Sequence, residues 1–143
     1  MAYGVEATAV VPLSRGLRAS FAGAAGRYIY SHNPFVTLYS DTDNSIVSQR
    51  SEALMGDCFV GGTPQVLARA ALNYFYGKGW AASCSVQYAG LRYVDASFVR
   101  RSERVLRQAT SSHEIYEQFV HQRRLRDAVT LDVSVSRWFR LGS

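Results

Sequence analysis

The sequence predicts an all-β protein, an antiparallel meander of about five long strands taken from a transmembrane β-barrel, with one short helix in a long loop. Three observations lead to this fold class. Apolar and polar residues alternate with period two in five segments, very short and very long connections follow one another in turn, and aromatic residues gather at strand ends. Period-two alternation is typical of strands with one apolar and one polar face.

The first two expected strands cover residues 4–13 and 17–31. Val5, Ala7, Ala9 and later odd positions are apolar in the first, and the odd positions from Leu17 continue the pattern in the second. Only Ser14-Arg15-Gly16 separates the two segments, and its glycine suits a tight hairpin turn. We therefore expect these strands to pair as neighbours.

The next two expected strands cover residues 63–77 and 80–95. Even positions from Val66 to Tyr76 and from Trp80 to Tyr88 share one face in each segment, opposite residues such as Arg69 and Ser85. The turn between them, Gly77-Lys78-Gly79, is again short and rich in glycine.

The last expected strand, residues 127–141, alternates most regularly. Its polar positions run from Thr130 to Ser136, and its apolar positions, which we assign to a lipid-facing surface, are Val129, Leu131, Val133 and Val135.

The two remaining connections are long and cover residues 32–62 and 96–126. Because short and long connections alternate, all short turns lie at one end of the expected sheet and both long loops at the other. Outer-membrane β-barrels have this asymmetry, with short periplasmic turns, long extracellular loops and aromatic girdles at the membrane interfaces. We expect a girdle at the short-turn end, formed by Tyr74, Tyr76, Trp80 and Trp138.

The second long loop contains the expected helix. Ser111 or Ser112 can cap a helix that runs through Glu114 to Val120. His113, Glu117 and His121 would share one face of that helix. Such residues on a solvent-exposed helix are usually surface residues, so we predict no metal site and no cofactor.

The formal net charge of +5 comes almost entirely from arginine, because Lys78 is the only lysine. Guanidinium groups bind carboxylate and phosphate oxygens in bidentate fashion. We interpret Arg100, Arg101 and Arg104 as a contact for an anionic ligand or lipopolysaccharide, with a solvated loop as the alternative. No recognition helix or stacking platform accompanies the basic residues, which argues against nucleic acid. No enzyme motif is present, so we expect no catalytic activity.

Several stretches resemble the C-terminal β-barrel region of TonB-dependent outer-membrane receptors of the Bacteroidetes type. In order along the chain, the matching stretches are GVEATAVVPLSRGL at 4–17, GRYIYSHNP at 26–34, VGGTPQVLARAALNYFYGKGW at 60–80, QYAGLRYVD at 87–95 and DAVTLDVSVSRWFRL at 127–141.

The resemblance implies a protein of the Gram-negative outer membrane that imports siderophore-iron complexes or similar large ligands. It also implies partners: membrane lipid and lipopolysaccharide, the rest of the receptor barrel, and a plug through which TonB acts. The sequence has no plug, no TonB box and too few strands for a closed barrel. We therefore expect a fragment that does not transport alone, and the alternative is a soluble β-rich ligand-binding module.

Overall fold

The computed structural model describes residues 1–77, 79–110 and 112–139. The chain divides into two compact units. The sheet unit comprises Gly4–Gly26, Pro64–Leu91 and Arg126–Ser143, and the loop unit comprises Met1–Tyr3, Arg27–Thr63 and Arg92–Leu125.

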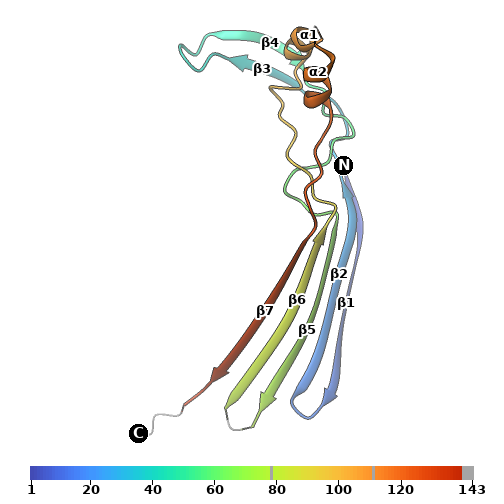
Figure 1. Ribbon diagram of the computed structural model, residues 1–143, viewed down its shortest axis with the longest axis vertical. Helices are drawn as coiled ribbons and strands as arrows, with labels where there is room; N and C mark the ends of the chain where they lie inside the picture. Colours follow the sequence, from blue (N-terminus) through green and yellow to red (C-terminus); the bar gives the residue numbers. More distant parts are fainter. Residues whose placement is uncertain (78, 111, 140–143) are drawn as a thin grey trace. The chain divides into compact units, whose positions relative to one another are not determined.

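The sheet unit is built on one five-stranded sheet with the order β1-β2-β5-β6-β7 (Figure 1). Its strands are β1 (Ala2–Ser14), β2 (Leu17–Tyr28), β5 (Val66–Tyr76), β6 (Trp80–Gly90) and β7 (Ala128–Arg137). The pairs β2–β5, β5–β6 and β6–β7 are antiparallel. Neighbours in the sheet are also successive sheet strands along the chain, so the predicted antiparallel meander of five strands is confirmed. The sheet is open, with β1 and β7 at its edges.

The strand register aligns the alternating patterns of the separate segments. Ala19 pairs with Leu72, Leu72 with Cys84, and Cys84 with Val133. One residue along, Arg18, Asn73, Ser83 and Ser134 form the adjacent row. Because side chains alternate between the two sides of a strand, each row lies on one face of the sheet. The register thus produces one apolar face and one polar face.

The turn between β1 and β2 requires glycine. Gly16 has a φ of 87°, and a Cβ atom there would lie 2.2 Å from the Phe75 carbonyl oxygen on β5. The Gly16 carbonyl accepts a hydrogen bond from the Phe75 backbone N–H at 2.7 Å. A side chain would therefore be strained and would push β5 away. Lys78, in the second predicted turn, lies outside the described residues.

Four further elements belong to the loop unit. They are the hairpin strands β3 (Phe35–Tyr39) and β4 (Ile46–Glu52), and the helices α1 (Glu103–Ala109) and α2 (His113–Val120). A small core of Ala53, Met55, Cys58 and Ala96 holds this unit together, with Tyr30 and Val36 packed against it.

Two expectations for the long loops are wrong. Residues 32–62 contain the β3–β4 hairpin rather than a plain loop. Residues 96–126 contain two short helices where one was expected; α2 matches the prediction and α1 was missed. Ser112 is the N-cap residue of α2, although its side chain makes no capping hydrogen bond; Ser111, the other predicted cap, lies outside the described residues.

Most sheet strands are shorter than expected. β2 ends at Tyr28 rather than at residue 31, and β5 covers Val66–Tyr76 rather than 63–77. β6 ends at Gly90 instead of residue 95, and β7 ends at Arg137, while the expected strand end at residues 140–141 lies outside the described residues. Of the segments beyond these ends, residues 29–63 after β2 and 92–125 after β6 belong to the loop unit.

Candidate functional site

The apolar face of the sheet is exposed along its length. The four residues predicted to face lipid are exposed by 65–70%: Val129, Leu131, Val133 and Val135. On neighbouring strands, Leu72 and Val86 are 48% and 43% exposed, and Cys84 between them is also exposed. Within the described part of the sheet unit, the strands form a single layer with nothing packed over this face.

Aromatic residues gather on the same face at the short-turn end of the sheet. Tyr76 pairs with Trp80, and the Tyr74 and Tyr76 rings stack with centroids 6.4 Å apart. The Arg137 guanidinium lies 4.9 Å from the Trp80 ring and 4.6 Å from the Phe139 ring. A cation held over aromatic faces is stabilised by their quadrupoles.

Trp138 follows β7 directly, and its backbone N–H donates to the Gly79 carbonyl at 2.8 Å. The four predicted girdle residues therefore lie at one end of the sheet.

The polar face is tied together across strands by side-chain hydrogen bonds. The Ser83 and Ser134 hydroxyls lie 2.7 Å apart, and Gln87 donates to the Asp132 carboxylate at 3.2 Å. Arg69 donates to the Ser85 hydroxyl at 3.4 Å. These bonds connect β5, β6 and β7 on the side opposite the exposed apolar residues.

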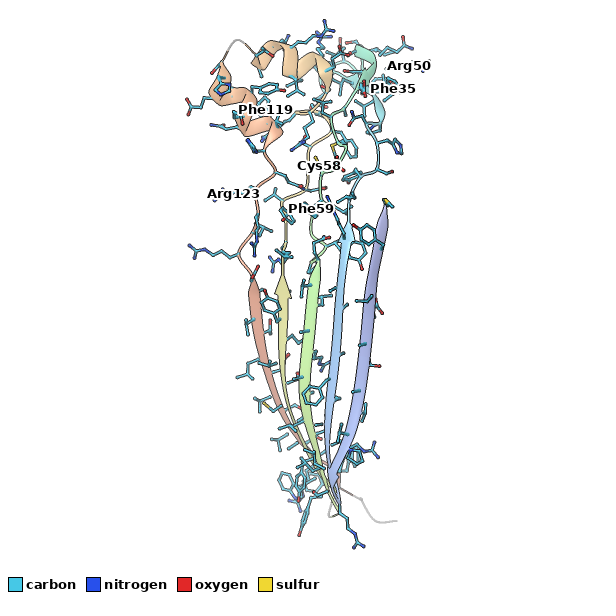
Figure 2. All side chains as sticks on the ribbon, turned by 90° about the vertical axis from the view of Figure 1, so that its right-hand side faces the viewer. Phe35, Arg50, Cys58, Phe59, Phe119 and Arg123 are labelled. Carbon is cyan, nitrogen blue, oxygen red and sulfur yellow. The ribbon has the colours of Figure 1, made fainter. Side chains whose placement is uncertain are left out.

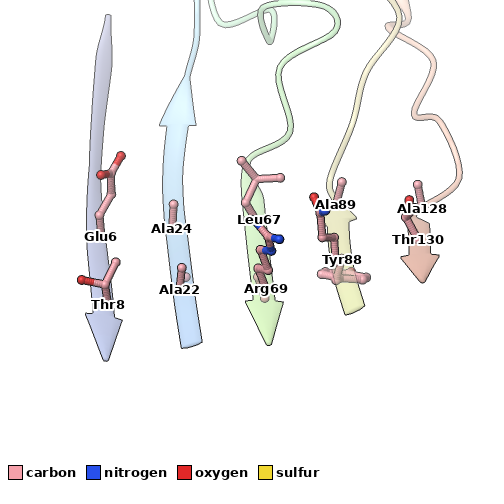
Figure 3. Close-up of a pocket in the computed structure, with 13 residues that line it drawn as sticks. Glu6, Thr8, Ala22, Ala24, Leu67, Arg69, Tyr88, Ala89, Ala128 and Thr130 are labelled. Carbon is pink, nitrogen blue, oxygen red and sulfur yellow. The ribbon is translucent and has the colours of Figure 1, made fainter. Parts of the chain in front are cut away.

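A hollow of about 380 Å³ lies on the sheet, and many of the residues that line it have small side chains (Figure 3). Ala22, Ala24, Ala89 and Ala128 leave space above the backbone. The charged residues among its lining are Glu6 and Arg69, with Gln87 and Thr130 adding polar groups. The hollow could accept a polar segment or ligand at the sheet surface.

The three arginines predicted to meet an anion are not brought together as one site. Arg101 is buried, and its guanidinium donates to the carbonyls of Leu54 at 3.1 Å and Val120 at 2.5 Å and to Cys58 Sγ at 2.8 Å. Arg100 is exposed, 5.9 Å from the Phe119 ring. Arg104 donates to the Val47 carbonyl. Arg101 therefore has a structural role, because its donors are committed to the interior of the loop unit.

Burial in the loop unit also raises the pKa values of Cys58 and Tyr30. Burial raises the pKa of the Cys58 thiol above its ordinary value, and the nearby Arg101 guanidinium partly opposes the shift. Burial likewise raises the pKa of the Tyr30 hydroxyl, with further contributions from Asp95 and Cys58. A thiol with a raised pKa stays protonated and reacts slowly.

A basic pocket lies beside β4, and no local sequence pattern predicts it. It has a volume of about 470 Å³, and its arginines are Arg50, Arg104 and Arg107. Arg50 adopts a left-handed conformation with φ 50°, which costs a non-glycine residue about 1–2 kcal/mol. The available signal for the β3–β4 hairpin was the turn-forming stretch SDTDNS between FVTLY and IVSQRSE, both of which begin with aromatic or β-branched residues.

The helix residues considered as metal ligands form an ordinary surface pair. His121 Nε2 lies 2.6 Å from Glu117 Oε2, one turn apart on an exposed stretch. Among the described residues, no group of three or more histidine, cysteine, aspartate or glutamate side chains is placed to hold a metal ion. None of the helices in the described part of the chain has the length and apolar character needed to cross a membrane.

Comparisons of the chain with protein-family models, with curated proteins and with solved structures found no match. The molecule is therefore characterised by its own geometry, an open antiparallel sheet with one exposed apolar face, one hydrogen-bonded polar face and a separately packed loop unit.

Proposed function

We propose that this chain forms part of the wall of a transmembrane β-barrel in a Gram-negative outer membrane, as a fragment of a TonB-dependent receptor. The observation that supports this most directly is the apolar face, which is exposed along the sheet and lies opposite a polar face. Alternation of an apolar outer face with a polar inner face is the pattern of barrel strands in lipid.

Solvation explains why lipid is the best occupant for the apolar face. Fully burying a valine or leucine side chain is worth about 1.5–3 kcal/mol. Val129, Leu131, Val133 and Val135 gain little of this in the isolated chain, since each is at least 65% exposed. Acyl chains would cover all four without requiring a shape-matched protein surface.

The dimensions of the strands are compatible with a membrane span. β5 and β6 each have 11 residues and β7 has 10, against about 9–11 residues for a tilted strand that crosses a bilayer. The rings of Tyr74, Tyr76 and Trp80 would then lie at headgroup depth, where amphipathic aromatic residues are enriched. The edges β1 and β7 would pair with further barrel strands, because backbone groups in lipid need partners.

In this proposal the chain supplies wall and loops and does not transport alone. Import of siderophore-iron or a similar large ligand would need the remaining barrel, the plug and the energy that TonB delivers through it. The ligand would meet the long connections between β2 and β5 and between β6 and β7, since the other connections of the sheet are tight turns.

A soluble β-rich ligand-binding module is the second candidate, and the hollow lined by Glu6 and Arg69 favours it. In that case a protein surface, rather than lipid, would cover the apolar face, and the protein would be monodisperse without detergent.

The two cysteines provide a direct test. Cys84 lies at mid-strand on the apolar face, and Cys58 is buried in the loop unit. In lipid vesicles where the chain is inserted as part of a closed barrel, Cys84 should resist a membrane-impermeant maleimide and react with a lipid-soluble one. The matched control is Ser134→Cys in a Cys84→Ser background, because Ser134 lies in the adjacent row on the polar face.

The proposal predicts that this control reacts with the impermeant reagent while Cys84 does not. Rapid reaction of Cys84 with the impermeant reagent in vesicles, together with a monodisperse protein without detergent, would reject the membrane assignment in favour of the soluble module.

A further inference from the structure

The basic pocket lies within the loop unit, between β4 and α1. Its volume is about 470 Å³, and four consecutive β4 residues and four α1 residues line it: Ser48, Gln49, Arg50, Ser51, Glu103, Arg104, Arg107 and Gln108. Pockets for small ligands typically have volumes of about 300–1,000 Å³. The space therefore exceeds what a lone ion needs and suits a phosphate with an attached group.

A bulge in β4 allows successive side chains of this strand to line the pocket. Leu38 pairs with Ser48 and Val36 with Ser51, so two β4 residues stand opposite one residue of β3. Arg50 is in this bulge and has a φ of 50°. In a regular strand, successive side chains would point to opposite faces, whereas a bulge re-aims a side chain. The bulge thus allows Arg50 to line the pocket together with its neighbours.

Each guanidinium group is held by one contact that leaves other donors available. Arg50 lies 5.4 Å from the Phe35 ring centroid (Figure 2), Arg104 donates to the Val47 carbonyl, and Arg107 pairs with Glu103. A guanidinium carries five N–H donors in a fixed fork. Arginines held in this way lose less side-chain freedom when they bind an oxyanion.

The charge around the pocket is unbalanced. Its lining contains three arginines and one carboxylate, that of Glu103. Three like charges around one space repel each other, and a bound anion would relieve that repulsion. Glu103 partly offsets the positive charge, so its removal should strengthen anion binding.

We propose that this pocket binds a phosphate-bearing ligand through Arg50, Arg104 and Arg107. Several arginine forks match the multiple oxygens of a phosphate better than the two oxygens of a carboxylate. The phosphate could belong to a soluble phosphorylated molecule or to a lipid headgroup. The site is internal to the loop unit and does not rest on the membrane assignment of the sheet.

The experiment measures binding of the full chain to two probes. Inorganic pyrophosphate in titration calorimetry represents free phosphates, and vesicles containing lipopolysaccharide, compared with neutral phosphatidylcholine vesicles, represent headgroups. The double variant Arg50→Gln/Arg104→Gln should lose at least about tenfold in affinity for the probe that binds, because two charge-assisted contacts to the phosphate are lost. Glu103→Gln should bind more tightly than the unaltered chain.

The matched control is Arg123→Gln/Arg124→Gln, which removes the same charge from the loop unit outside the pocket lining. It should retain affinity within about twofold at moderate ionic strength, because both residues are exposed, neither lines the pocket, and salt screens exposed charges. Circular dichroism confirms that all variants fold.

Binding of pyrophosphate assigns a free phosphate ligand, and binding of lipopolysaccharide vesicles alone assigns a headgroup. The proposal is overturned if neither probe binds, or if the control variant loses as much affinity as the pocket variant.

Discussion

Arg101 joins three parts of the loop unit through a single guanidinium group. It donates to the carbonyls of Leu54, between the core residues Ala53 and Met55, and of Val120, at the end of α2, and it lies against the buried thiol of Cys58. A buried charge is tolerated when its donors are satisfied. The residue thus links the segment after β4 to the second helix.

Replacing Arg101 with glutamine should therefore destabilise the loop unit by about 2–4 kcal/mol, because two partly buried carbonyls and the buried Cys58 thiol lose a charged donor. Both tryptophans lie in the sheet unit, so Cys58 is the better reporter. In a Cys84→Ser background, its thiol should react about 30 to 1,000 times faster, as the open state becomes more populated. Arg100→Gln, at an exposed position, is the control and should change stability by less than about 0.5 kcal/mol. Equal thiol rates in the two variants would contradict the structural role of Arg101.

The raised pKa of Cys58 predicts how pH acts on the same unit. The folded state favours the protonated thiol, so its contribution to stability is fully present below the ordinary pKa of 9.0 and is lost as pH rises through the higher folded pKa. Hydrogen–deuterium exchange of the segment around Met55 measures this loss. Between about pH 8 and pH 10, the opening of this segment should increase more in the unaltered protein than in Cys58→Ala. The absence of any difference between the two proteins across this range would refute the linkage.

At the scale of elements, β7 offers the sharpest test of which surface meets lipid. Leu131 pairs with Val86 on the apolar face, and Ser134 pairs with Ser83 on the polar face. In membrane-inserted protein, Leu131→Arg should cost about 2–4 kcal/mol of unfolding free energy, while Ser134→Arg should cost little. Urea unfolding in lipid vesicles measures both. In a soluble protein with an exposed β7, the two substitutions would be equally tolerated.

The sheet was predictable from the sequence because each of its strands has its own period-two pattern and needs no partner to reveal it. Val129 to Ser136 shows the pattern without interruption. The β3–β4 hairpin was missed because neither FVTLY nor IVSQRSE alternates with period two, and the bulge at Gln49 and Arg50 makes the pairing of β4 irregular as well. Helix α1 has only seven residues, too few for a clear helical period.

Of the candidate sites too, one could be predicted from a local sequence pattern and another could not. The aromatic end of the sheet could be predicted, since Tyr74, Tyr76 and Trp80 flank one short turn in the sequence. The basic pocket could not, because Arg50 and Arg104 lie 54 positions apart in the sequence and meet only through the packing of α1 beside β4. Whether an arginine such as Arg101 is buried or exposed likewise depends on tertiary contacts that local pattern does not encode.

At the scale of the whole molecule, the sheet order has a mechanical consequence. Strand directions alternate across the sheet, so the edge strands β1 and β7 run the same way (Figure 1). If the start of β1 and the end of β7 are pulled apart, the two forces therefore act parallel to the strands and in opposite directions. Antiparallel hydrogen bonds lie perpendicular to the strands, so this tension loads all the bonds of a seam at once. The sheet should resist such stretching firmly, whereas a force applied across the strands would peel the edge strand away one bonded pair at a time.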